Sequence, residues 1–329
     1  THTRLMDYLL LVVGLALLLL GANYLVDSSV AIAKRAKISN FIIGLTIVGI
    51  GTGAPELFVS IQSALTGHGD IAMGNVVGSN ITNLLLILGV TAVICPFAIE
   101  KQTHRSDIPF GIFAAVLLTM FVNDSWNPGI DENILSRLDG GVLLIIFISY
   151  FIYTLFIKAK NPQEAKEEMD QDATSSLEGK KPALLWVIAA VSLGALLCGG
   201  QLFLDSAINL ARAWGMSEAV ISITIVAVGT SLPELITSVL AACKNNPQLA
   251  LGNILGSNVF NILMILGLTA SITPIHVEGI NAIDFMVMIG ATVATFIVTY
   301  TFKKKKFDRA EGVIFLLCYI AYTIYLLMR

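Results

Sequence analysis

One stretch occurs twice in the chain and restricts its fold more than any other feature. The first copy runs from Gly51 to Glu56 (GTGAPE) and the second from Gly229 to Glu234 (GTSLPE). Each copy lies inside a long apolar segment without Lys or Arg, and each ends in a carboxylate. A carboxylate in the middle of a membrane-spanning segment costs roughly 2.5–3.5 kcal/mol, so it needs a partner. The repeated pattern indicates that this partner is a cation that comes and goes.

The composition is that of a membrane protein. Of the 329 residues, 56% are hydrophobic and only 13% are charged, whereas soluble domains average about 25% charged residues. Apolar windows of membrane length predict an all-α integral membrane protein with ten transmembrane helices. The approximate ranges are 6–30, 38–65, 71–94, 107–122, 138–157, 183–208, 216–242, 248–271, 282–302 and 309–328.

The distribution of positive charge predicts the orientation. Most of the 20 Lys and Arg residues fall in alternate loops, including the polar stretch 158–182 between the fifth and sixth predicted helices. Positively charged loops stay in the cytoplasm. We therefore expect a multi-pass protein of the cell (inner or plasma) membrane, with 158–182 in the cytoplasm and both termini outside. We expect it to work as a monomer in the bilayer, without nucleic acid or an obligate protein partner.

The two halves of the chain are copies of one another. They align at a constant offset of 178 residues, and segments 74–89 and 252–267 are identical at most positions. Each half holds five predicted helices, and an odd number inserts the second half upside down. Inverted repeats are typical of secondary transporters, whose ion sites lie near the bilayer midplane. The predicted organisation is one five-helix repeat over 1–157, the loop 158–182, and a second, inverted repeat over 183–329.

Oxygen-bearing side chains share helix faces with the two carboxylates. Thr52 and Glu56 are four residues apart, as are Thr230 and Glu234, so each pair lies on one face. The helix that follows each pair carries a second polar stripe. Its members are Asn75, Ser79 and Asn83 in the first half and Asn253, Ser257 and Asn261 in the second. Oxygen ligands suit hard cations such as Ca²⁺ and Na⁺, whereas softer metals prefer His or Cys.

Proline should break both helices that carry the carboxylates. Pro55 and Pro233 lack an N–H group and clash with the carbonyl four residues earlier. The carbonyls released in this way would serve as further ligands, which a membrane tolerates where the backbone lines a cavity.

The paired motifs G-T-x-x-P-E and G-N-x-x-G-S-N-x-x-N resemble the alpha repeats of sodium/calcium exchangers, within the cation/calcium antiporter superfamily. The resemblance covers nearly the whole chain. It implies an antiporter that exports Ca²⁺ in exchange for Na⁺ by alternating access, with long first and sixth helices that slide. It implies no enzymatic activity and no cofactor, with Ca²⁺ and Na⁺ as transported ions.

The resemblance also implies a set of ligands. Glu56 and Glu234 would hold Ca²⁺ between them, and Asn83 and Asn261 would lie in the middle of the cluster. Two Na⁺ sites would flank them. The first would use Thr52, Ser79, Glu234 and the carbonyl of Gly49, and its mirror would use Thr230, Ser257, Glu56 and the carbonyl of Ala227.

Two positions depart from the family pattern. Gly53 stands where the second repeat has Ser231, so we expect Ser231 to contribute to its side and the two flanking sites to differ. Asn261 stands where potassium-dependent relatives carry Asp, which argues against coupling to K⁺.

Two other functions remain open at this point. A Ca²⁺/H⁺ antiporter would use the same carboxylates, although the proton-coupled branch of the family carries G-N-A-x-E in place of G-T-x-x-P-E. A cation channel would need a continuous pore and usually an oligomeric ring of charges, which the internal repeat disfavours.

Several residues outside the cage also carry expectations. We expect the four cysteines to be reduced packing residues, because they form no C-x-x-C pair. They are Cys95, Cys198, Cys243 and Cys318. Asp27 and Asp205 lie near predicted membrane ends, where we expect interfacial water to solvate them. Asn80 and Asn258 point away from the predicted ligand face, so we expect them to be structural hydrogen-bond partners.

Overall fold

The computed structural model describes residues 2–101, 103–123, 133–157, 175–216, 225, 227–277, 280–300 and 306–328. Within these described ranges, seven helices are long and apolar enough to cross a membrane, or eight if the bent pair Asn40–Thr52 and Ala54–Leu65 forms one span. The predicted all-helical, multi-pass membrane fold is confirmed. Two of the ten predicted spans correspond to shorter apolar helices, α13 (Leu232–Cys243) and α16 (Ala282–Val298). Much of the start of the predicted span 216–242 lies outside the described residues.

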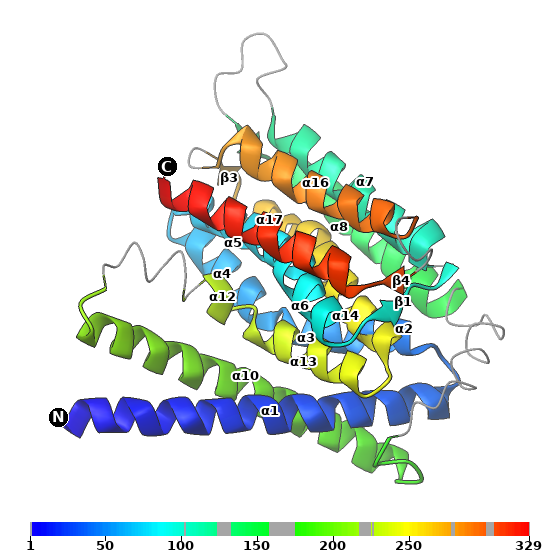
Figure 1. The fold of residues 1–329 in the computed structure, drawn as a ribbon. Coiled ribbons are helices and arrows are strands. Elements are labelled where there is room, and N and C mark those ends of the chain that lie inside the picture. Colours follow the sequence, from blue (N-terminus) through cyan, green and yellow to red (C-terminus); the bar gives the residue numbers. More distant parts are fainter. Residues whose placement is uncertain are drawn as a thin grey trace.

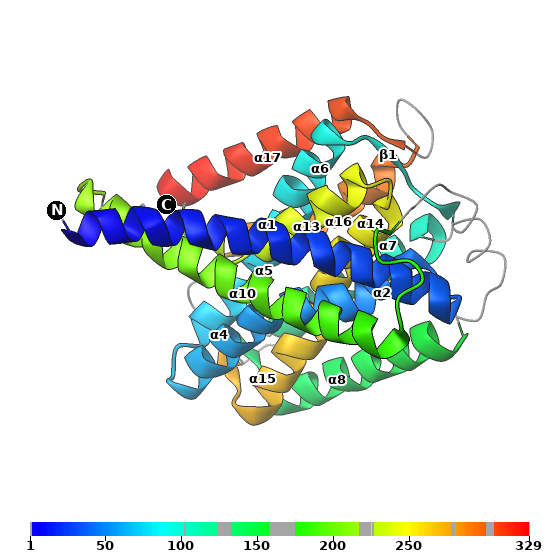
Figure 2. The same ribbon diagram turned by 90° about the horizontal axis from the view of Figure 1, so that it is seen from below.

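The two longest helices, α1 (His2–Ala36) and α10 (Pro182–Ala213), run antiparallel beside each other along one side of the molecule (Figures 1 and 2). Their backbones touch where they cross. A Cβ atom on Gly199 would lie 2.7 Å from the backbone nitrogen of Leu18, and one on Gly21 would lie 2.6 Å from that of Leu196. Small residues of this kind allow membrane helices to pack closely.

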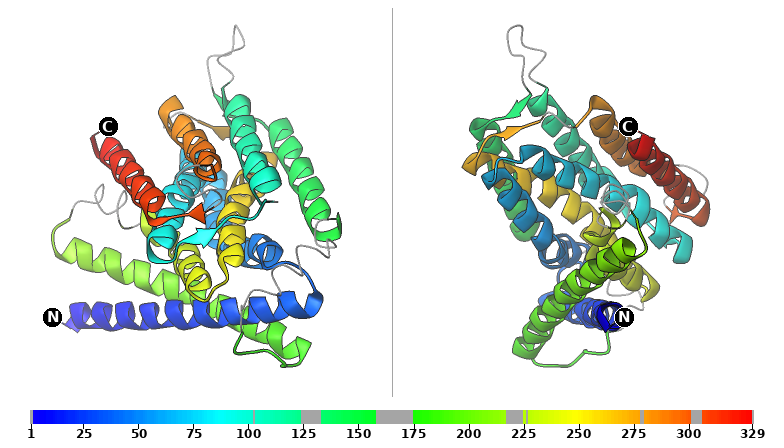
Figure 3. Two further views of the ribbon diagram at one scale, coloured as in Figure 1. Left: turned by 45° about the vertical axis from the view of Figure 1, so that its right-hand side comes forward. Right: turned by 90° about the vertical axis from the view of Figure 1, so that its left-hand side faces the viewer.

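The other helices gather on one side of this pair (Figure 3). The third and eighth predicted spans are Gly69–Ile94 and Pro247–Ile272. In their most apolar 18 residues, 72% and 94% of the residues are buried, against at most 33% in the other five long helices of the described residues. They consist of α5 (Gly69–Ile81), η2 (Thr82–Ile87) and α6 (Leu88–Ile94), and of α14 (Pro247–Val259), η8 (Phe260–Ile265) and α15 (Leu266–Ile272). The centre of the molecule is therefore built from the segments that carry the second polar stripes.

The remaining elements pack around this centre. In the first half they are α2 (Asn40–Ile43), η1 (Gly44–Val48), α3 (Gly49–Thr52), α4 (Ala54–Leu65), η3 (Thr103–Asp107), α7 (Ile108–Val122), α8 (Arg137–Ile152) and η5 (Tyr153–Ile157). In the second half they are α12 (Ala227–Gly229), α13, α16 and α17 (Arg309–Met328). The N- and C-termini lie on the same side of the molecule (Figures 1 and 2).

Two short antiparallel strand pairs join the halves of the chain, and the sequence did not predict them. Strand β1 (Phe97–Ala98) pairs with β4 (Lys306–Phe307), and β2 (Ile134–Leu135) pairs with β3 (Ile275–His276). Each pair therefore takes one strand from each half, which no local pattern could reveal.

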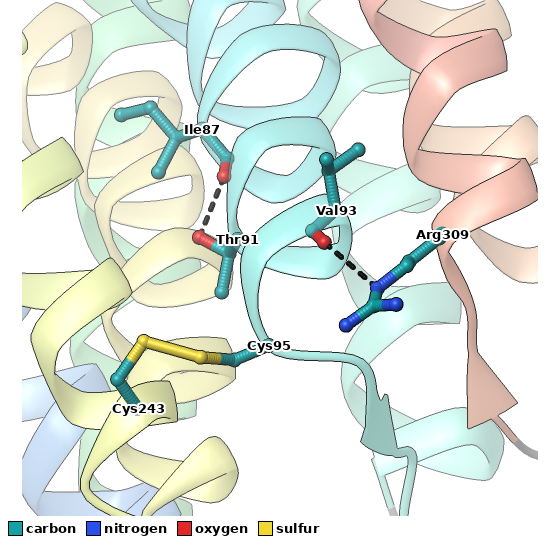
Figure 4. The surroundings of a disulfide bond; sticks show 6 residues. All are labelled: Ile87, Thr91, Val93, Cys95, Cys243 and Arg309. Atoms are coloured by element: carbon teal, nitrogen blue, oxygen red, sulfur yellow. Dashed lines mark hydrogen bonds between the residues drawn. A yellow bond between two sulfur atoms is a disulfide. The ribbon is translucent and has the colours of Figure 1, made fainter.

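A disulfide bond makes a further connection between the halves, so the prediction of four reduced cysteines is wrong for two of them. Cys95 follows α6, Cys243 ends α13, and their sulfur atoms are bonded (Figure 4). Their Cα atoms are 5.6 Å apart, within the range that a disulfide requires. The two residues are 148 positions apart in sequence, and only the packing of α6 beside α13 brings them together. Cys198 and Cys318 are free.

Candidate cation site

The two repeated carboxylates lie in the first turns of two helices. Glu56 is in the first turn of α4 and Glu234 in the first turn of α13, and each helix has a proline at its start. Proline suits this position because the first N–H groups of a helix have no partner within the helix. The expected break is confirmed in the first copy, where the segment Asn40–Thr52 and α4 meet at 45°. The positive ends of both helix dipoles therefore lie at the carboxylates and stabilise their charge.

Both carboxylates are buried without a fixed positive partner. Glu56 and Glu234 are each only 2% exposed. Neither forms an ion pair with a Lys or Arg of the described residues, whose recorded pairs are Lys34–Glu178 and Lys244–Asp27. Such an arrangement is costly unless a cation binds to it.

Residues from the two halves meet at this point. The hydroxyl of Thr52, the last residue of α3, donates to Oδ1 of Asn253 at 3.3 Å. The hydroxyl of Ser257 donates to the carbonyl of Gly49 at 3.4 Å. The family resemblance grouped this carbonyl with Ser79, whereas the contact that the structure records is with Ser257.

Two members of the second stripes support the site instead of facing an ion. Nδ2 of Asn75 donates to the backbone carbonyl of Glu56 at 3.2 Å and to Oγ of Ser60 at 3.1 Å. The amide of Asn253 makes the equivalent two bonds in the second half, at 3.4 Å and 3.0 Å. These amides fix the first turns of α4 and α13, and with them the positions of both carboxylates.

Five oxygen atoms of the predicted ligands are buried and have no hydrogen-bond partner among the described residues. They are Oε2 of Glu56 and of Glu234, Oδ1 of Asn83 and of Asn261, and Oγ of Ser231. Unpaired buried oxygens are rare in proteins, and a bound ion is one way in which they are satisfied. Asn83 and Asn261 also lie in the π-helical segments η2 and η8, and such segments are frequent at functional sites.

The other predicted ligands lie on the same short elements. Ser79 is buried on α5, Thr230 lies in the turn between α12 and α13, and Ala227 begins α12. The structure does not describe the side chain of Ala227. The predicted role of its backbone carbonyl as an ion ligand stays a prediction.

The difference between Gly53 and Ser231 has a packing explanation that the sequence did not supply. A Cβ atom on Gly53 would lie 3.1 Å from the ring of Phe260. The residue equivalent to Phe260 in the first half is Thr82, which is smaller. Gly53 therefore leaves room for a phenylalanine, whereas Ser231 keeps a buried hydroxyl.

The site combines two carboxylates with neutral amide and hydroxyl oxygens. Within the described part of the chain, no cluster of three or more His, Cys, Asp or Glu residues could hold a metal ion. Oxygen-rich ligand sets suit Ca²⁺, which takes 6–8 oxygens, and other hard cations. Two negative charges balance one divalent ion or two monovalent ions.

Comparisons with known proteins agree with this chemistry. A model of the family described as "Sodium/calcium exchanger protein" matches residues 6–156 and 184–328. The chain is 32% identical to the sodium/calcium exchanger MaX1 of Methanosarcina acetivorans, over 97% of this chain and 98% of that protein. It is 33% identical to the inner membrane protein YrbG of Escherichia coli, over 85% of this chain and 84% of that protein.

The fold also matches solved structures of the sodium-calcium exchanger NCX_Mj. One of them, soaked with zero Na⁺ and Ca²⁺, aligns with a TM-score of 0.80 and 31% identity over 96% of this chain and 97% of that chain. Another, soaked with 2.5 mM Na⁺ and 0.1 mM Ca²⁺, aligns with a TM-score of 0.78 and 31% identity over equal shares. The chain therefore belongs to the sodium/calcium exchanger family of membrane antiporters.

Proposed function

We propose that this protein exports Ca²⁺ in exchange for Na⁺ by alternating access, with both ions bound in a cage around Glu56 and Glu234 near the bilayer midplane. One observation carries the proposal: one oxygen of each buried carboxylate and three further ligand oxygens have no hydrogen-bond partner among the described residues. A transported cation satisfies all of them at once, and its departure leaves a site with two uncompensated charges.

In this proposal the remaining ligands are those of the family resemblance, with one regrouping. Because Ser257 contacts the Gly49 carbonyl, we group these two residues in one flanking Na⁺ site. The other site then uses Ser79 with the carbonyl of Ala227. Thr52 and Thr230 complete the cage, and the unpaired hydroxyl of Ser231 strengthens the second side.

The proposed membrane topology has ten spans in two inverted five-helix repeats, 1–157 and 183–329, joined by a cytoplasmic loop at 158–182. Both termini would be outside, and their position on one side of the molecule supports an even number of crossings (Figure 1). Hydrogen bonds and π-helices that recur at an offset of 178 residues support the repeat. We propose that a single copy of the chain in the bilayer suffices.

Export of Ca²⁺ requires more than electroneutral exchange. Two carboxylates balance one Ca²⁺ or two Na⁺, but cytosolic Ca²⁺ is kept far below the outside level. A third Na⁺ would bring one net charge inward per cycle, which supplies ~2.3 kcal/mol per 100 mV of membrane potential. Exchange without leak follows if the empty site, with its two negative charges, does not cross between the two states.

Uptake of ⁴⁵Ca²⁺ into sodium-loaded proteoliposomes tests the proposal. Uptake should require internal Na⁺ and should stop when the liposomes contain K⁺, Li⁺ or choline instead. It should also increase when a K⁺ diffusion potential makes the inside positive, because Na⁺ then carries net charge out. Uptake that follows a pH gradient without Na⁺ would identify a Ca²⁺/H⁺ antiporter. A Ca²⁺ flux without any counter-ion gradient would identify a channel.

A further inference from the structure

Two buried asparagines that are not predicted ligands form a symmetric pair across the two halves. Asn80 on α5 and Asn258 on α14 are 1% and 7% exposed. Nδ2 of Asn80 donates to the backbone carbonyl of Asn258 at 3.3 Å, and Nδ2 of Asn258 donates to the backbone carbonyl of Asn80 at 3.3 Å. A backbone carbonyl only accepts hydrogen bonds, so these contacts fix which end of each amide is the NH₂ group.

The free end of each amide then faces a predicted ligand from the opposite half. Oδ1 of Asn80 accepts from Nδ2 of Asn261 at 3.1 Å, and Oδ1 of Asn258 accepts from Nδ2 of Asn83 at 2.9 Å. Both NH₂ groups of Asn83 and Asn261 are therefore used. Their Oδ1 atoms are the ones left without a partner among the described residues.

We infer that Asn80 and Asn258 are positioning residues that set the side-chain orientation of Asn261 and Asn83 for cation binding. An asparagine amide presents either a carbonyl oxygen or an NH₂ group, and only the oxygen can bind a cation. In each half, a backbone carbonyl fixes the amide of Asn80 or Asn258. That amide in turn holds the NH₂ group of a predicted ligand, so the ligand's oxygen is left for the cation. Each half of the chain thus orients a ligand of the other half.

This inference rests on the proposed function, because it assigns a role to a ligand of the proposed cage. It differs from the earlier expectation that Asn80 and Asn258 are structural. A structural role predicts a loss of stability when either residue changes. A positioning role predicts a loss of ion affinity when residue 83 or 261 is an asparagine. It predicts no such loss when that residue carries oxygen atoms at both positions.

The test is a double-mutant cycle on Ca²⁺ binding to the purified full-length protein in lipid nanodiscs. Asn258→Leu removes the acceptor that holds Asn83, so the Asn83 amide can turn. The half-saturating Ca²⁺ concentration should rise about tenfold, which corresponds to about 1.4 kcal/mol. Asn83→Asp places oxygens at both positions, so turning the side chain no longer removes a ligand. In that background Asn258→Leu should not raise the half-saturating concentration, because it removes an acceptor oxygen that would face a carboxylate oxygen.

The symmetric cycle, with Asn80→Leu and Asn261→Asp, should give the same pattern. Thr91→Val is the matched control, because the Thr91 hydroxyl bonds only the Ile87 carbonyl of its own helix in the contacts recorded for it (Figure 4). If Asn258→Leu does not fold, Asn258→Ser replaces it, since the shorter hydroxyl cannot take the place of the amide oxygen beside Asn83.

An equal loss of affinity in both backgrounds, or no loss in the wild-type background, would overturn the inference and leave the proposed function standing. A wild-type protein that binds neither Ca²⁺ nor Na⁺ would overturn both.

Discussion

The centre of the molecule is nearly symmetric, whereas the equivalent ends of its two long helices differ. At the centre, the contacts of Asn80 with Asn261 recur as those of Asn258 with Asn83. On the long helices, Asp27 of α1 and Asp205 of α10 occupy equivalent positions. Asp27 is 6% exposed and bonds Lys244, at the end of α13, at 2.6 Å. Asp205 is exposed and bonds Gln201 of its own helix at 2.8 Å.

The difference corrects one expectation. The expectation that interfacial water solvates Asp27 is wrong, because this side chain is buried. Its carboxylate also accepts a hydrogen bond from the Ser176 hydroxyl at 2.6 Å. The residue equivalent to Lys244 in the first half is Thr66, so α10 cannot form the same ion pair with α4. The centre therefore repeats its contacts in both halves, whereas α1 is fastened to α13 at one end by an ion pair that α10 lacks.

Loss of a central carboxylate should have the largest effect, and an equal effect on the two sides. Glu56→Gln and Glu234→Gln each remove half of the charge that balances Ca²⁺. Breaking a buried charge pair costs roughly 3–5 kcal/mol, so Na⁺-dependent Ca²⁺ uptake should fall by more than about 100-fold. Thermal unfolding in detergent would verify that both variants fold. Normal exchange in one variant and none in the other would show that the centre is not symmetric in function.

Loss of the ion pair on α1 should have an intermediate effect, on one end only. Lys244→Met leaves the Asp27 carboxylate without its cation, and the Lys244 side chain is 26% exposed. We expect a cost of about 1–2 kcal/mol, between exposed and buried pairs. The ratio of molecules with α1 docked on α13 to molecules with α1 undocked should fall about 5- to 30-fold. The distance between spin labels on the two helices measures this ratio.

The matched change on the other long helix is Asp205→Asn, which should leave this ratio unchanged. Asp27→Asn combined with Lys244→Met should restore part of the docked population, because no uncompensated charge remains. A docked population that is the same in Lys244→Met as in the wild type would show that the pair does not hold α1.

A smaller effect should come from the one asymmetry inside the cage. Ser231→Gly removes a buried hydroxyl oxygen, and we expect the Na⁺ concentration for half-maximal exchange to rise about three- to tenfold, a typical loss for a single polar contact. Gly53→Ser alone should bring no gain, because its Cβ atom would lie 3.1 Å from the Phe260 ring. Gly53→Ser with Phe260→Thr reproduces the second side and should lower that Na⁺ concentration. A gain from Gly53→Ser alone would show that packing is not the reason for the glycine.

The smallest effect should come from a second contact on α1. A hydrogen bond from Lys34 lowers the pKa of Glu178 below its ordinary value of 4.5. Because the pKa is lowered on folding, this contact stabilises the protein above pH 4.5 and loses its effect as the pH falls through the lowered value. The pair is exposed, so Glu178→Gln should cost less than about 1 kcal/mol at pH 7. The thermal unfolding temperatures of Glu178→Gln and the wild type should differ slightly at pH 7, and this difference should be smaller at pH 4.

The sequence predicts the centre of this protein better than its connections. Glu56, Glu234 and the prolines before them are visible because each is unusual within its own apolar segment. The orientation of the Asn261 amide depends on Asn80, 181 residues away, and the ion pair of Asp27 depends on Lys244, 217 residues away. Such contacts follow from how helices pack, and a single sequence does not contain that information. The repeat is visible in a single sequence because the two halves of the chain can be aligned with each other.

The bond between Cys95 and Cys243 turns part of this chain into a closed ring. The ring holds everything from β1 to α13, including the whole of α10 and the chain between residues 157 and 175. A protease cut in that connection would open the ring without releasing either fragment. On a gel without reductant the two pieces would migrate together, and with reductant they would separate. The same closure ties the end of α6 to the end of α13, so α10 lies within a loop whose two ends cannot part.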